Sequence, residues 1–119
     1  MKYKVKHISV YIDLPASRIY NFIYDLNNLS KWATGLSQIG KVKIKFADKN
    51  KFWILDHDVT LESGIKIYNP MRVIPNGKGG EVLFSLFQQP NMSKKEFSKD
   101  SGFVKKDLKR LKKILEKQK

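Results

Sequence analysis

The hydrophobic pattern of the amino-terminal region changes from a strand period to a helix period. Residues 3–13 predict a strand, because apolar side chains recur there at every second position. We expect a helix to follow, opened by the fixed φ of Pro15 and capped by Asp13, and a second short helical turn over residues 29–33. The residues that share an apolar face are Ile8, Val10 and Ile12 in the strand, and Ile19, Phe22, Ile23 and Leu26 in the helix.

From about residue 40 the apolar positions return to a period of two, which is typical of an antiparallel meander. The strongest turn signal of the chain is the glycine-rich stretch 76–80. The predicted strands of this meander cover residues 41–46, 52–61, 65–75 and 81–89.

The last part of the chain predicts one long amphipathic helix. Ser93 and Glu96 have the spacing of a capping box, in which each side chain bonds the backbone of the other residue. The apolar stripe that follows has helical spacing and is suited to lie on a sheet. This stripe consists of Phe97, Val104, Leu108, Leu111 and Leu115, with Ser101 on the same face.

This order of elements predicts an α+β protein that forms a single domain over residues 1–119. The chain has 119 residues, which is enough for one hydrophobic core without disulfide or metal staples. It has no cysteine, so thiol nucleophiles and cysteine-based metal or iron–sulfur sites are excluded, and we expect no cofactor. No apolar run approaches the length of a membrane span, so we expect a cytoplasmic protein.

The net charge of +13 raises the question of a nucleic-acid partner. Nearly all of the basic residues are lysine, whereas base and phosphate recognition favour the arginine fork, and this argues against nucleic acid. Residues 94–119 are the most basic part, with ten lysines and Arg110 against four carboxylates. A solvated basic surface is the favoured interpretation, and electrostatic binding to an anionic surface is an alternative.

Several segments resemble one known superfamily. They are the stretch from Val5 to Trp32, with its Leu14-Pro15-Ala16-Ser17 helix entry, and the segments FWILDHDVTL, IYNPMRVIPNG, GEVLFSLFQQP and MSKKEF to LKKILE. Together they resemble the START-like, polyketide cyclase/dehydrase (SRPBCC) superfamily, and within it a short bacterial subgroup with no assigned reaction. The resemblance implies a helix-grip fold, in which a curved antiparallel sheet wraps the C-terminal helix and encloses an apolar cavity. Fold alone does not fix function, because this superfamily contains carriers, receptors and enzymes.

The hairpin 52–61/65–75 has one register that keeps an apolar face intact. A three-residue turn with Gly64 at positive φ pairs His57 with Asn69 and continues the pairing to both ends of the hairpin. His57 and Asn69 then form a polar pair within an apolar strip that faces the cavity. The expected apolar pairs are Leu61 with Ile65, Val59 with Ile67, Leu55 with Met71 and Trp53 with Val73.

His57 is the candidate catalytic residue, as a general acid or base or as a hydrogen-bond anchor. The simpler alternative is a buried histidine satisfied by Asn69 or a backbone carbonyl. On the opposite face, Asp56 and Asp58 are expected to form a cross-strand ion pair with Arg72 rather than an acid–base pair. No metal site is expected, because the chain has only two histidines.

The first functional hypothesis is a module that binds a small apolar or amphipathic molecule between the sheet and the C-terminal helix. The alternative is a cyclase-, dehydratase- or hydrolase-like enzyme that uses His57, and a homodimer is open in either case. Aromatic residues such as Tyr20 and Tyr24 favour core packing over ligand contact. The candidate ligand-binding residues are Trp32, Trp53, Leu55, His57, Asn69, Met71, Phe84 and Leu108.

Overall fold

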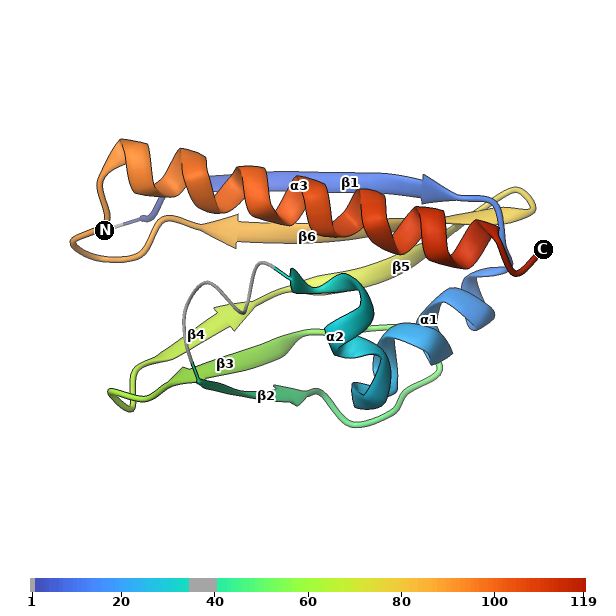
Figure 1. Ribbon diagram of the computed structural model, residues 1–119, viewed down its shortest axis with the longest axis horizontal. Coiled ribbons are helices and arrows are strands. Elements are labelled where there is room, and N and C mark those ends of the chain that lie inside the picture. Colours follow the sequence, from blue (N-terminus) through green and yellow to red (C-terminus); the bar gives the residue numbers. More distant parts are fainter. Residues whose placement is uncertain (1, 35–40) are drawn as a thin grey trace.

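A computed structural model describes residues 2–34 and 41–119 of the chain (Figure 1). It confirms the α+β class, with antiparallel strands, two short helices after the first strand and a long C-terminal helix packed on a sheet. In chain order the elements are β1 (Val5–Ile12), α1 (Ala16–Tyr24), the 3-10 turn η1 (Leu26–Asn28), α2 (Leu29–Trp32), β2 (Val42–Phe46), β3 (His57–Leu61), β4 (Lys66–Asn69), β5 (Met71–Asn76), β6 (Gly79–Phe87) and α3 (Lys94–Glu116).

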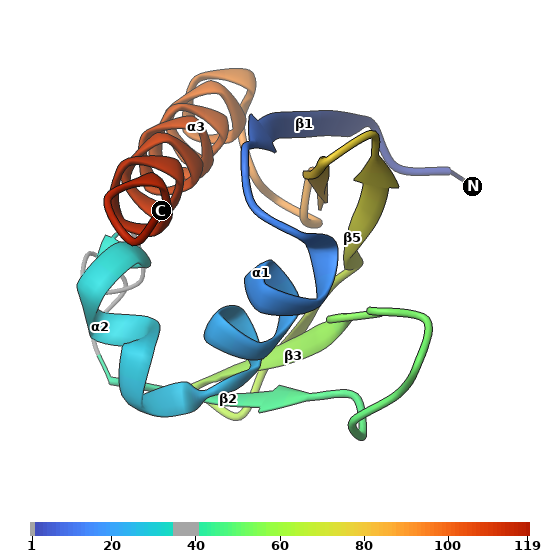
Figure 2. The same cartoon turned by 90° about the vertical axis from the view of Figure 1, so that its right-hand side faces the viewer.

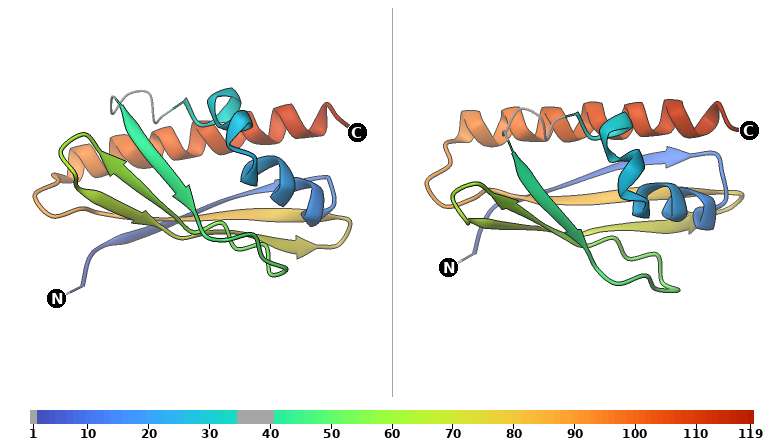
Figure 3. Two further views of the ribbon diagram at one scale, coloured as in Figure 1. Left: turned by 90° about the horizontal axis from the view of Figure 1, so that it is seen from below. Right: turned by 60° about the horizontal axis from the view of Figure 1, so that its bottom comes forward.

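The strands form two antiparallel three-stranded sheets, with the orders β1-β6-β5 and β2-β3-β4. Pro70 separates β4 from β5, so the chain passes directly from one sheet to the other at this residue. A proline cannot donate a ladder hydrogen bond, which explains why a strand predicted as continuous from 65 to 75 is divided here. Figure 3 shows β4 and β5 following one another along the same curved ribbon.

The register predicted for this hairpin is confirmed. His57 pairs with Asn69 and Val59 with Ile67. The same register extends past Pro70, because the Leu55 amide donates to the Met71 carbonyl at 2.7 Å. At the other end of the hairpin Gly64 has a φ of 90°, as the three-residue turn requires.

The strand predicted over 52–61 is shorter than expected, since β3 begins only at His57. The cause is the side chain of Asn50, whose Oδ1 accepts from the amides of Phe52 and Ile54, both at 3.0 Å. The Asn50 side chain thus takes up backbone amides that would otherwise bond a neighbouring strand, as the short side chains of Asn and Asp do in loops. Trp53, at a φ of 58°, lies in the left-handed region and breaks the strand further.

Two expectations for the first helix are wrong. Asp13 does not cap it: the N-cap position is Pro15, with no side-chain cap, and the Asp13 carboxylate instead accepts from the Lys119 side chain. Leu26 lies beyond the end of α1 and is 51% exposed. Tyr20 is buried although it was not part of the predicted apolar face, and its hydroxyl accepts from the Asn50 amide at 3.1 Å.

The long helix α3 begins as predicted. The Ser93 hydroxyl accepts from the Glu96 amide, and the Glu96 carboxylate accepts from the Ser93 amide, so the capping box is complete. The predicted stripe faces the interior, with Val104 only partly buried. The buried residues of α3 are Phe97, Ser101, Asp107, Leu108, Leu111 and Leu115.

Seen end on, the elements enclose a common interior (Figure 2). α3 lies beside β1, α1 lies inside the curve of the sheets, and α2 is close to α3. The core is therefore shared by both sheets and by all three helices. Its fully buried large side chains are Tyr20, Ile12, Ile19, Ile23, Leu55, Met71, Leu108, Leu111, Leu115, Val59 and Val82.

Candidate functional site

A pocket of about 310 Å³ lies between α2, the amino-terminal half of α3 and the inner faces of the strands. This volume is at the lower end of the range for small-molecule sites. The pocket takes its walls from both sheets, because the passage at Pro70 brings β4 and β6 to its two sides. Its lining includes Trp32, Phe46, His57, Val59, Ile67, Asn69, Phe84, Leu86, Gln89, Glu96, Lys99, Asp100, Phe103, Val104, Asp107 and Leu108.

His57 contributes a neutral imidazole to this pocket. Its Nδ1 lies 3.0 Å from the carbonyl oxygen of Leu55, and because a carbonyl only accepts, Nδ1 carries the proton. Burial lowers the pKa of His57 below its ordinary value, against the opposing effects of the Leu55 hydrogen bond and the nearby aspartates. The second nitrogen, Nε2, makes no hydrogen bond with the described residues and is a lone-pair acceptor.

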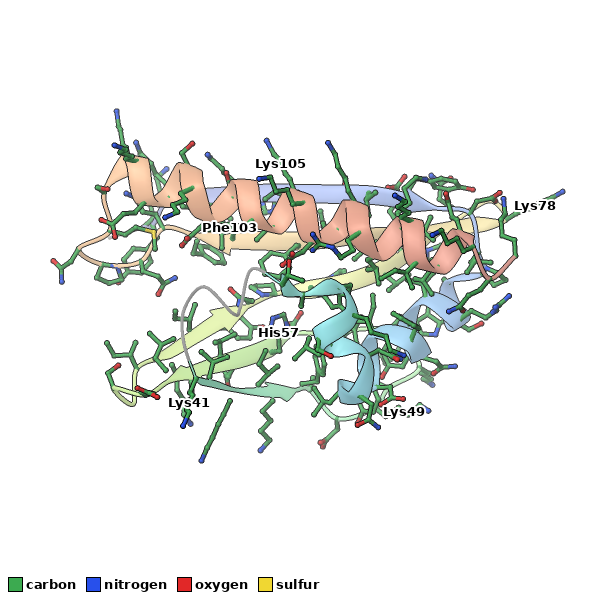
Figure 4. The ribbon with its side chains drawn as sticks, in the orientation of Figure 1. Lys41, Lys49, His57, Lys78, Phe103 and Lys105 are labelled. Carbon is green, nitrogen blue, oxygen red and sulfur yellow. The ribbon has the colours of Figure 1, made fainter. Side chains whose placement is uncertain are left out.

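Two aromatic rings fix the orientation of the imidazole. The Phe46 ring meets it edge-on with a centroid separation of 5.2 Å, and the Phe84 ring does so at 5.8 Å from the other sheet. Figure 4 shows His57 at the start of β3, in the region between α3 and the sheet β2-β3-β4. The imidazole is therefore held in place before any ligand arrives.

Two polar atoms of the pocket walls are buried and have no hydrogen-bond partner among residues 2–34 and 41–119. They are Nε1 of Trp32 and Oδ1 of Asn69, in residues that are 5% and 7% exposed. A buried polar group without a partner costs about 1–3 kcal/mol, so native proteins seldom leave one without a reason. Both residues line the same pocket, and this marks the pocket as a place where a ligand can complete the hydrogen bonding.

The candidate residues divide into two groups in the structure. Trp32, His57, Asn69, Phe84 and Leu108 line the pocket together. The other three, Leu55, Met71 and Trp53, do not: Leu55 and Met71 are enclosed in the core, and Trp53 packs against its edge. The helix α1 lies inside the curve of the sheets (Figure 2) and contacts β5, the strand that begins at Met71.

Sequence reasoning missed the carboxylates of α3, which are part of the pocket lining. Glu96, Asp100 and Asp107 all face the pocket from one side of the helix. Their spacings of four and seven were a usable signal, because such positions share a helix face. Asp107 has a structural role, since its carboxylate accepts from the Thr34 hydroxyl at 3.1 Å and pairs with Arg110 at 3.3 Å.

The expected ion pair of Arg72 with Asp56 or Asp58 is wrong. Among the described residues, no ion pair joins Arg72 to either carboxylate. The Asp56 carboxylate instead accepts from the Tyr68 hydroxyl at 2.7 Å and from the Met71 amide at 2.8 Å. Asp56 thus bonds one residue of β4 and one of β5 on either side of Pro70, which itself has no backbone donor.

Helical membrane spans and clusters of metal ligands are both absent from residues 2–34 and 41–119. No helix in these ranges is long and apolar enough to cross a membrane. In the same ranges, no three histidine, aspartate or glutamate side chains are grouped as ligands for a metal ion. Lysines of α3 such as Lys105 lie on its outer side, away from the pocket (Figure 4).

The fold and the pocket define an α+β protein with a long helix laid over curved antiparallel sheets around an internal pocket. No protein-family model matches the chain, and no curated protein matches its sequence. Solved structures do share its fold. MLL2253 from Mesorhizobium loti aligns with a TM-score of 0.73 at 10% identity, over 98% of this chain and 99% of that one.

Two further solved structures with a similar fold are CalU16 and DynU16. CalU16 from Micromonospora echinospora aligns with a TM-score of 0.71 at 12% identity, over 95% of this chain and 74% of that one. DynU16, from the dynemicin biosynthetic locus, aligns with a TM-score of 0.71 at 13% identity, over 97% of this chain and 48% of that one. This chain therefore spans about half of DynU16, and at such identities the likeness shows the fold alone.

Proposed function

We propose that this chain is a START-like domain that binds a small amphipathic molecule in the pocket between α3 and the sheets. The observation that carries the proposal is the combination of a 310 Å³ pocket with two unpartnered buried polar atoms in its walls. An ordinary core would close over apolar groups and satisfy its polar ones. The shared fold of CalU16 and DynU16 is in keeping with this proposal.

The chemistry of the walls describes the ligand in outline. Apolar side chains from both sheets, such as Val59 and Phe84, would contact its body. Nε2 of His57 and the amide of Asn69 lie on paired residues of adjacent strands, so one polar group of the ligand can bond both. A ligand NH2 group suits this position because it has two hydrogens, and both Nε2 of His57 and the unpartnered Oδ1 of Asn69 accept.

A thermal-shift screen of the purified protein tests the proposal. Panels of fatty acids, small aromatic polyketides and sterols are compared at matched concentrations, because a ligand that binds only the folded state raises the midpoint. We expect a rise with small members and none with sterols, since the pocket is at the small end of ligand sites. Hits should lose their effect in an Asn69→Leu, His57→Phe double variant, which fills the polar position with apolar atoms. Hits that survive this change would overturn the assignment to this pocket.

A second candidate function, acid–base catalysis, is favoured by the state of His57. A neutral imidazole with a free Nε2 in a pocket is a competent general base, and the α3 carboxylates supply further titrating groups on the facing wall. The test is to follow each hit for chemical turnover by mass spectrometry. A product formed by the wild type and lost in His57→Gln, with binding retained, would establish catalysis; unchanged hits would exclude it for those compounds.

A further inference from the structure

The polar side chains that line the pocket offer more hydrogen-bond acceptors than donors, and Nε1 of Trp32 and Nζ of Lys99 are the donors that stand against this excess. His57 offers Nε2, because its Nδ1 proton is committed to Leu55. The Gln89 side chain donates from its amide nitrogen to the Phe87 carbonyl at 3.1 Å, and its Oε1 is an acceptor. Asn69 adds an Oδ1 that has no partner among the described residues. A molecule that satisfies these atoms brings hydrogen-bond donors, and of the buried unpartnered atoms only Nε1 of Trp32 calls for an acceptor.

The carboxylates of the lining also favour a ligand that brings hydrogen-bond donors. Glu96 and Asp100 stand one turn apart on α3 and both line the pocket, with Asp100 half-buried and Glu96 at the exposed mouth. Among the described residues, neither carboxylate is in an ion pair. Burial, and then the charge of Glu96, raise the pKa of Asp100. A positive group placed between them would relieve this repulsion.

The negative charge of Glu96 and Asp100 at the pocket is unusual for this chain, which has 24 basic and 11 acidic residues. Among the described lining residues, Lys99 is the only lysine or arginine, and its Nζ lies over the Phe103 ring, 5.9 Å from the centroid. The pocket mouth thus departs from the positive surface around it. Because charges beyond about 8–10 Å are screened at physiological salt, the nearest carboxylates dominate at the mouth.

We propose that the pocket selects amphiphiles whose head group is a protonated amine, held at the mouth by Glu96 and Asp100. This rests on the proposed function of the pocket and specifies the charge of its ligand. An ammonium group has three donors and no acceptor, which complements the carboxylates and Oε1 of Gln89. Asn69 is more than nine-tenths buried, and its Oδ1 has no partner among the described residues, which independently indicates that a donor-bearing ligand belongs there. Nε1 of Trp32 is a donor and is not satisfied by the amine.

The alternatives are disfavoured for physical reasons. A carboxylate head group would place a third negative charge against Glu96 and Asp100, with only Lys99 to offset it. An alcohol of the same shape would keep the apolar contacts and would lose the attraction to the carboxylates. The order of affinity within a matched series should therefore be amine, then alcohol, then carboxylate.

The test uses phenylbutylamine, phenylbutanol and phenylbutyrate, which share one apolar body and differ in the head group. Titration calorimetry with the full chain at neutral pH measures each affinity. We expect the amine to bind about tenfold more tightly than the alcohol, the size of one charge-assisted hydrogen bond at a partly exposed site. We expect this advantage to shrink as salt is raised.

Two substitutions remove the charges and keep the fold. Asp100→Asn is close to isosteric, and Glu96→Gln preserves the capping box, which accepts glutamine at this position. In the double variant the amine should lose its advantage while the affinity for phenylbutanol stays unchanged. Asp58→Asn is the matched control, because Asp58 lies outside the pocket lining and should alter none of the three affinities.

Each outcome separates the two proposals. If phenylbutanol binds and the amine binds no better, or the carboxylate binds best, the charge assignment is overturned and the pocket stands. If the amine preference survives in the double variant, the carboxylates named here are not its source and the assignment is overturned. If none of the three compounds binds, and the thermal-shift screen also gives no hit, the binding function itself is overturned.

Discussion

His57 on β3 and Asn69 on β4 are direct cross-strand partners, and both side chains face the pocket. Neither satisfies the other: His57 bonds the Leu55 carbonyl, and Oδ1 of Asn69 has no partner. The simpler interpretation of the sequence, a histidine satisfied within the core, is thus true for one of its nitrogens. The pair leaves both a lone pair and an amide available to a ligand.

Asn69→Leu should raise the stability of the ligand-free protein. Leucine has a similar shape and removes the buried Oδ1, whose lost hydration costs about 1 kcal/mol or more. Urea denaturation should therefore show a free energy of unfolding about 1 kcal/mol higher than in the wild type, with ligand binding weakened. A large loss of stability would contradict this, since it would mean that the amide is satisfied within the fold.

Leu108→Ala should cost less than Leu111→Ala. Both leucines are fully buried on α3, but only Leu108 borders the pocket, so the space left by its side chain joins an existing pocket instead of forming a closed void. A packed leucine costs about 2–5 kcal/mol when cut to alanine, and we expect Leu111 in that range and Leu108 below about 2 kcal/mol. Urea denaturation measures both.

The same variant should also change the ligand preference. Leu108→Ala enlarges the pocket and should favour bulkier members of a ligand series, whereas Leu111→Ala should leave the preference unchanged. Equal losses of stability with no change of preference would place Leu108 in the ordinary core, away from the pocket wall.

Much of the fold follows from local rules in the sequence. The capping box of Ser93 and Glu96 specifies where α3 begins, and the positive φ of Gly64 specifies the hairpin register. That register alone places His57 opposite Asn69. These features are predictable because each depends on residues close together in the chain or on a repeated period.

The parts that were not predicted depend on individual side-chain contacts, some local and some between distant parts of the chain, rather than on a repeated period. The strand before His57 is lost because Asn50 captures backbone amides, and α1 is not capped by Asp13 because that carboxylate meets Lys119 at the other end of the chain. Leu55 and Met71 were expected at the pocket and lie in the core instead, because their side chains are enclosed by residues that are far apart in the sequence. A period in one segment carries no information about such neighbours.

His57 should make the protein less stable in mild acid. Its folded pKa lies below its ordinary value of 6.5, so the unfolded chain binds the proton more readily. As the pH falls from 6.5 toward the folded pKa, the free energy of unfolding therefore decreases, and below the folded pKa this contribution is constant.

His57→Gln tests this directly by urea denaturation over a pH series. The variant has no titrating group at this position, so its stability should fall less steeply than that of the wild type below pH 6.5, and the two curves should run parallel above it. Curves that are parallel throughout would show that the imidazole has the same proton affinity in both states.

Gly79 and Gly102 should respond in opposite directions to alanine. A Cβ on Gly79 would lie 2.5 Å from the Ile12 carbonyl oxygen and would also collide with the Tyr11 hydroxyl, so β1 must shift. Such overpacking costs about 1–3 kcal/mol. A Cβ on Gly102 meets nothing within 4 Å on an open face of α3, and there alanine gains about 0.5–1 kcal/mol through its helix propensity. Thermal denaturation of the two variants should therefore move the midpoint down for Gly79→Ala and up for Gly102→Ala; a fall in both would mean that α3 bends at Gly102 and needs its flexibility.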